Sequence, residues 1–146
     1  EEQNRQIKEL LEAKEKDILN VRFEDWVSKE EYPSLLKDMD VGLISLTAKN
    51  TTPAVPAKLI GYLAASLPAL GFLHKESEAR EIIHEAKCGE SALYDDEDAC
   101  LNIIVQMYDN RGKLEVMREK GKEYAKQHFS IETSIKQWEE VIRKNN

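Results

Sequence analysis

Long hydrophobic runs and an excess of positive charge are both missing from this sequence of 146 residues. No apolar stretch approaches the roughly 20 residues that cross a bilayer, and residues 1–16 are too polar for a signal peptide. The formal net charge of -7 argues against nucleic acid or an anionic membrane as the partner. We therefore expect a cytoplasmic protein that does not bind nucleic acid.

Cysteine is scarce, and the common catalytic motifs are missing. Cys88 and Cys100 form no CxxC pair, and no histidine lies at metal-ligand spacing from either of them. We expect two reduced, structural thiols and no metal site. The sequence has no Gly-rich phosphate loop, no GxSxG and no HExxH, so it identifies no catalytic residue.

Apolar residues are plentiful enough for a core, because they make up 41% of the chain. A domain of this length buries about two thirds of the surface that its unfolded chain exposes. Strand-like and helix-like segments alternate, which predicts a parallel sheet with flanking helices. We expect one α/β domain over residues 1–146, with a Rossmann-like sheet and a helical cap over about residues 95–146 packed on it.

The first half of the chain carries the clearest strand. A helix is expected over residues 2–16 and a strand over 18–24. Ser28 and Glu31 have the spacing of a capping box, which predicts a short helix with Pro33 in its first turn. The nearly continuous apolar run at residues 41–46 predicts a strand covered on both faces.

The remaining elements follow from the periodicity of apolar residues. Asp95 is expected to cap the first helix of the helical cap, and Ser130 with Thr133 marks the start of the last helix. The expected elements are a helix over 56–65, a strand over 69–73, a helix over 77–86, a strand over 89–94, and helices over 96–109, 111–127 and 131–144.

Ligands of open parallel sheets bind beyond the carboxyl ends of the strands, which points to the loop after residue 46. Proline favours the first helical position, so we expect the next helix to start at Pro56. The amides of Ala57 and Lys58 would then lack a capping side chain and could bind a phosphate. Water or a nearby loop could satisfy them instead. His74 is a second candidate, because it lies in a loop at the same edge.

Several segments resemble the carboxyl-terminal domain of retaining glycosyltransferases of family 4, which have the GT-B fold. Residues 20–23, 30–36 and 40–43 match its early strands and helix. PAKLIGYLAASLP, at residues 56–68, is similar to the family's PSKLxEYxAAGxP. Residues 78–83 with 88–89 resemble its GEAAELV…GCG segment, and residues 121–130 resemble its GRxYAxxxFS ending.

The resemblance implies a domain that binds a nucleotide-diphosphate sugar and needs neither metal nor cofactor. The diphosphate would lie at Pro56, Ala57 and Lys58. The base and ribose would lie around residues 24–26, where Trp26 could stack on the base, and along Gly61 and Tyr62. Thr52 and Glu78 complete the implied binding residues.

The resemblance also implies the setting of such a domain. It would be part of a hexosyltransferase-type enzyme that transfers the sugar to a polysaccharide or glycolipid. An N-terminal acceptor-binding domain or upstream segment would be its partner, and the full enzyme could associate peripherally with a membrane.

The departures from the family pattern favour a second interpretation. Family members often carry two glutamates with seven residues between them, at positions where this chain has Pro53 and Gly61. Ser66 replaces a usual glycine, and Ser77 rather than glycine precedes Glu78. The family's first two strand–helix units, with their diphosphate-binding Arg and Lys, have no counterpart here. The chain would then be a fragment, or a naturally short domain with an exposed sheet edge, and the alternative function is a non-catalytic interaction module.

Overall fold

The computed structural model describes residues 27–47, 49 and 55–144. The helix expected over 2–16 and the strand expected over 18–24 lie outside the described residues. The chain divides into two units, residues 1–31 and 32–146, which are treated separately below.

In the first unit, the capping box of Ser28 and Glu31 forms as predicted. The backbone N–H of Glu31 donates to Ser28 Oγ over 3.2 Å, and the backbone N–H of Ser28 donates to Glu31 Oε2 over 3.3 Å. This reciprocal pair satisfies two amides that the following helix leaves open. Helix α2, Tyr32–Lys37, starts at the next residue, with Pro33 in its first turn.

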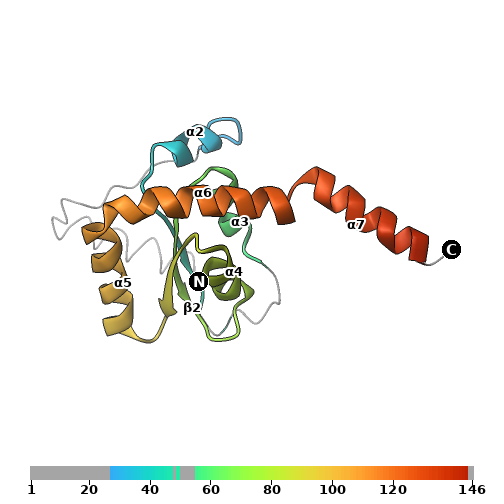
Figure 1. The fold of residues 1–146 in the computed structure, drawn as a ribbon. Coiled ribbons are helices and arrows are strands. Elements are labelled where there is room, and N and C mark those ends of the chain that lie inside the picture. Colours follow the sequence, from blue (N-terminus) through green and yellow to red (C-terminus); the bar gives the residue numbers. More distant parts are fainter. Residues whose placement is uncertain (1–26, 48, 50–54, 145–146) are drawn as a thin grey trace. The chain divides into compact units, whose positions relative to one another are not determined.

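The second unit is built on a parallel sheet of three strands, as the alternation of segments predicts (Figure 1). The strands are β1 (Gly42–Ser45), β2 (Ala69–Leu73) and β3 (Gly89–Leu93), in that spatial order. Gly42 pairs with Ala69, which pairs in turn with Gly89. The connections are α3 (Ala57–Ala64) and α4 (Glu78–Ala86). This is an α/β sheet compatible with a Rossmann-like fold.

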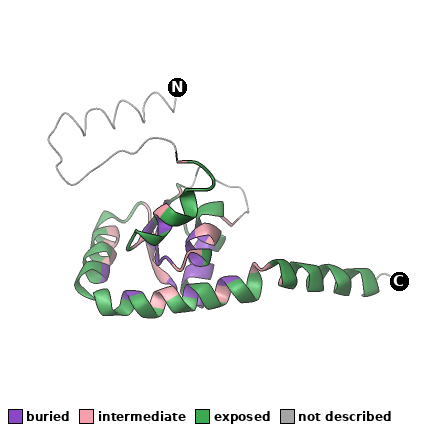
Figure 2. Ribbon diagram, turned by 90° about the horizontal axis from the view of Figure 1, so that it is seen from above, coloured by how far each residue is buried: buried purple, intermediate pink, exposed green. Residues whose placement is uncertain are grey.

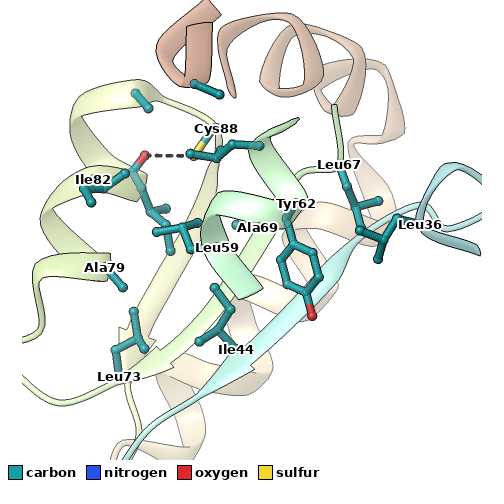
Figure 3. Packing of buried hydrophobic residues seen from close by; sticks show 14 residues of the cluster. Leu36, Ile44, Leu59, Tyr62, Leu67, Ala69, Leu73, Ala79, Ile82 and Cys88 are labelled. Atoms are coloured by element: carbon teal, nitrogen blue, oxygen red, sulfur yellow. Dashed lines mark hydrogen bonds between the residues drawn. The ribbon is translucent and has the colours of Figure 1, made fainter. Parts of the chain in front are cut away.

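The core lies between this sheet and the helices α3 and α4 (Figures 2 and 3). Ala79, Ile82 and Ile83 of α4 are buried, as the periodicity predicted. Leu59 and Leu63 of α3 are fully buried and hold that helix on the strands. Each such side chain stabilises the fold by about 1.5–3 kcal/mol relative to an exposed one.

The opposite face of the sheet is covered less completely. Helix α5 (Glu97–Asp109) packs over β3, whereas on β1 buried and exposed residues alternate and Leu43 is 49% exposed. The prediction that β1 is covered on both faces is therefore wrong. A continuous apolar run does not show how much of its second face the other elements cover.

Helix α6 (Arg111–His128) lies along the amino ends of the strands. Its Arg118 guanidinium donates to the carbonyls of Met39, Asp40 and Ser66, which precede β1 and β2. Its Gly121 lies against Leu63 and against Cys88, which precedes β3; a Cβ at this position would be 3.1 Å from Cys88 Cβ. The amino edge of the sheet is thereby closed.

Helix α7 (Ile131–Lys144) has no buried residue and points away from the sheet (Figure 2). Ser130 caps it as predicted, since Ser130 Oγ accepts the backbone N–H of Thr133 over 3.1 Å. The expected helical cap therefore packs through α5 and α6 but not through α7. The cap of α5 is Asp96 rather than Asp95, because Asp96 Oδ1 accepts the amide of Ala99 over 2.9 Å.

Lys87 ends α4 in a left-handed conformation, with φ of 51°. The N–H of Lys87 donates to His84 O and that of Cys88 to Ile83 O, the hydrogen-bond pattern of a Schellman motif. Glycine prefers this position because a Cβ in a left-handed conformation is strained.

We expect Lys87→Gly to raise the free energy of unfolding by about 1 kcal/mol, because it removes this strain. Chemical denaturation followed by circular dichroism measures the change. The matched control is Lys122→Gly in the exposed interior of α6, which should lower the free energy by about 1 kcal/mol. The interpretation fails if both substitutions destabilise the protein equally.

Candidate functional site

The carboxyl edge of the sheet, where β1 ends, is the candidate site. Helix α3 starts there with Pro56 as its capping residue, at φ -58° and ψ 127°, and no side chain accepts a cap hydrogen bond. The prediction that Pro56 is the first helical residue is wrong by one position, because Pro56 is the capping residue and Ala57 is the first helical residue. The amide of Leu59 donates to Pro56 O over 2.9 Å, whereas the amides of Ala57 and Lys58 precede the first intrahelical hydrogen bond.

Ala57 and Lys58 are both exposed at this helix start. The helix dipole places partial positive charge there, and the Lys58 ammonium adds a full charge. The core fixes the position of the donors, because Leu59, immediately next in the chain, is fully buried. The arrangement can bind an oxyanion through two amides and one cation.

The start of α4 also lies at the carboxyl edge, after β2. His74 Nδ1 is 3.5 Å from Glu76 Oε2, and the His74 side chain is 15% exposed. Ser77, the capping residue of α4, is buried, and Glu78 is exposed in the first turn together with Glu81. Carboxylates at a helix start compete with a bound anion, so this edge has less capacity for an anion than α3 alone suggests.

Tyr62 lies inside the core rather than at the surface. Its ring covers Gly42 so closely that a Cβ on Gly42 would be 2.6 Å from the ring, and its hydroxyl donates to Leu43 O over 3.1 Å. Burial raises the pKa of the Tyr62 hydroxyl above its usual value. Figure 3 shows the ring between Leu36 and Ile44. Tyr62 therefore joins α3 to β1, and its hydroxyl hydrogen is already donated to Leu43 O.

Gly61, in contrast, is not crowded by any of the described residues. A Cβ there would have Tyr32 Cε1, 4.0 Å away, as its nearest neighbour. A larger side chain therefore fits at the point where the resemblance expects a ribose-binding glutamate. Thr52 and Trp26, the other expected ligand contacts, lie outside the described residues.

The last matching segment holds the structure together rather than facing the candidate site. Ala125 is buried, and Tyr124 Oη donates to Glu85 Oε2 of α4 over 3.1 Å. Phe129 packs against the core, and Ser130 caps α7. The role of Arg118 was not predicted from the sequence. Its three carbonyl partners are distant in the chain, and the residues around Arg118 give no indication of them.

Neither cysteine has the environment of a reactive thiol. Burial raises the pKa of the Cys88 thiol to about 11. The pKa of Cys100 is also raised, first by desolvation and then by Asp96, Asp95 and Glu97, and its Sγ donates to Leu93 O over 3.2 Å. Both thiols therefore stay protonated at neutral pH, and neither is a ready nucleophile.

Within the described part of the chain, no three His, Cys, Asp or Glu side chains gather closely enough to hold a metal ion. The described helices include none that is both long and apolar enough to cross a membrane. No protein-family model matches the chain, and no curated protein or solved structure matches it. The motifs and the geometry above are therefore the basis for any functional proposal.

Gly61→Ala should raise the free energy of unfolding by about 1 kcal/mol, because helix propensity improves and no atom obstructs the methyl group. Gly121→Ala is the matched control in α6. Its methyl group would be 3.0 Å from Leu63 Cδ2, so overpacking should cancel or exceed the gain in propensity. Thermal and denaturant unfolding measure both, and equal effects would contradict the packing described here.

Alkylation should distinguish the buried thiol from a normal one. With its pKa raised to about 11, Cys88 carries roughly 100-fold less thiolate at pH 8 than a cysteine at the usual value of 9.0. Iodoacetamide labelling, quantified by peptide mass spectrometry, should therefore be at least 100-fold slower in the folded chain than in denaturant. Rapid labelling of Cys88 in the folded protein would show that the site is open.

Proposed function

We propose that this chain binds the diphosphate of a nucleotide-diphosphate sugar at the start of α3, as the donor-binding part of a retaining GT-B glycosyltransferase. The observation that carries the proposal is the start of α3 at the carboxyl edge of a parallel sheet, where Ala57 and Lys58 are exposed and the capping residue Pro56 makes no side-chain cap hydrogen bond. The segment that resembles the family's PSK motif begins at the same helix start, so two independent arguments lead to one place.

The chemical contribution of such a site is electrostatic. When the sugar leaves its donor, negative charge increases on the diphosphate, and fixed N–H groups stabilise that charge without reorganising. The Ala57 and Lys58 amides and the Lys58 ammonium would supply part of this stabilisation. No residue of this chain can be assigned the role of the family's Arg and Lys, so those charges would come from an N-terminal acceptor-binding domain or an upstream segment.

The non-catalytic interaction module remains the second candidate, and Gly61 favours it. The space beside Gly61 would accept a carboxylate, yet none is present to hold a ribose. Tyr62, on the same helix, uses its hydroxyl inside the core. A site that has lost its ribose contact would keep the anion-binding helix start and lose selectivity for nucleotides.

Nuclear magnetic resonance titration tests the donor site directly. UDP, GDP and ADP, each alone and as its glucose conjugate, are added to the uniformly ¹⁵N-labelled chain. The expected result is weak binding with the largest shifts at the amides of Ala57 and Lys58. Inorganic pyrophosphate serves as the comparison, because binding of pyrophosphate with equal affinity would support the non-catalytic alternative. Shifts confined to regions far from residues 47–62 would overturn the proposal.

Ala57→Pro removes one of the two donors without interrupting the helix. Proline is favoured at the first helical position, and the extended conformation of Pro56, with ψ of 127°, is the one that a residue before proline prefers. We expect nucleotide affinity to fall about tenfold, as a lost charge-assisted hydrogen bond predicts. Ile131→Pro, at the first position of α7, is the control and should leave affinity unchanged.

Gly61→Glu tests the ribose position by addition. If the donor lies along α3, the new carboxylate should increase affinity for UDP over pyrophosphate, because only UDP has a ribose. Gly61→Gln, of similar size and without charge, is the control. An equal effect on UDP and pyrophosphate would show that the nucleoside does not lie beside Gly61.

A further inference from the structure

Two surfaces of the second unit expose apolar side chains. The first, the α7 stripe, consists of Ile131, Ile135, Trp138 and Ile142, which recur at helical spacing. Trp138 is 70% exposed and Ile131 is 75% exposed. Isolated helices of this length are marginally stable in water, and most helices are stabilised by packing an apolar face. The α7 stripe therefore needs a partner.

The second surface, the α5 groove, lies on the incompletely covered face of the sheet. It encloses about 190 Å³ between the sheet, α5 and the start of α6, and nearly all of its lining is apolar. Exposed Leu43, on the same face of β1, extends the apolar surface beyond it. Its apolar lining residues are Val41, Leu70, Ile104, Met107, Tyr108 and Leu114.

The start of the α7 stripe, Ile131, cannot reach the α5 groove of its own chain. Asn110 ends α5 and begins α6, so the groove lies at the start of α6 and α7 follows its end. An α6 of 18 residues is about 27 Å long. The link to α7 consists of Phe129 and Ser130, three Cα steps that reach at most about 11 Å. The start of α7 can therefore reach this groove only in a second molecule.

Charge sets the direction in which such a helix would lie. Helix α5 begins with Glu97 and Asp98, preceded by two aspartates, whereas α7 ends with Arg143 and Lys144. At the other end of the groove, the Arg111 guanidinium lies 5.0 Å from the centre of the Tyr108 ring. It would face the α7 end that carries Glu132. Both ends are complementary when α7 runs antiparallel to α5.

We propose that two copies of this chain form a symmetric dimer in which the α7 stripe of each copy lies in the α5 groove of the other. One two-fold axis pairs both helices with both grooves, so the contact is closed and no further copies are recruited. Trp138 is the central side chain, because large aromatic residues dominate the affinity of such interfaces. The dimer requires no part of the nucleotide-sugar proposal.

Light scattering during size-exclusion chromatography tests the assembly. At about 100 µM the chain should elute as a dimer, whereas Trp138→Glu and Ile104→Glu should each elute as folded monomers, with helical content checked by circular dichroism. Val116→Glu is the matched control, because Val116 is 61% exposed on α6 and lies outside both surfaces. The proposal is overturned if the chain is a monomer, or if Trp138→Glu remains a dimer.

Mixing the two monomeric variants tests the exchange itself. Trp138→Glu retains an intact groove and Ile104→Glu an intact helix, so an equimolar mixture should regain one of the two contacts and form a weaker heterodimer. If the dimer instead formed between two α7 helices, mixing would not restore it. The absence of a heterodimer would therefore refute the pairing of α7 with the α5 groove.

Charge reversal tests the direction. Arg143→Glu with Lys144→Glu should weaken dimerisation about tenfold, and adding Glu97→Lys with Asp98→Lys should restore it. Failure of the restoration would show that the helix does not run antiparallel to α5.

Discussion

The close approach of α6 to the amino ends of the strands is the constraint on which the rest of the second unit depends. Gly121 allows it, because a side chain there would collide with Leu63 and Cys88. Arg118 then reaches three carbonyls in segments that are far apart in the sequence. Each of these carbonyls lies in a turn that needs a donor, and one guanidinium has enough N–H groups for all of them. The carboxyl edge is left as the side that can receive a ligand.

The contact between Gly42 and Tyr62 links this constraint to the candidate site. The Tyr62 ring fills the space that a side chain at position 42 would occupy, and its hydroxyl forms a hydrogen bond that joins α3 to β1. The start of α3 is thereby positioned by residues in the middle of the helix. The same contact removes Tyr62 from the candidate ligand contacts. An aromatic residue inside a binding motif can serve the geometry of the motif rather than the ligand.

Most of the described fold could be predicted from the sequence, because strands and helices have distinct periodicities. β2 has the bounds that were predicted, and the Ser28 and Ser130 caps form as expected. The predictions were wrong where tertiary contacts determine which residues are exposed. The exposure of Leu43 depends on which elements cover the second face, and the exposure of α7 depends on the direction in which the helix leaves α6. The donors at Ala57 and Lys58 were predictable because a helix start exposes amides wherever it lies, whereas the placement of Tyr62 required the structure.

The position of α6 after the three described strands has a consequence for synthesis. All three strands leave the ribosome before Arg118 and Gly121 do, so the sheet first forms without the helix that closes its amino edge. During that interval Leu63 and Cys88 lack a covering helix, and the nascent chain exposes apolar surface. The closing contacts join residues separated by as many as 79 positions, a long-range closure of the kind that slows folding. Closure of the sheet therefore waits for α6, and a chaperone would encounter the unit with the amino edge of the sheet still open.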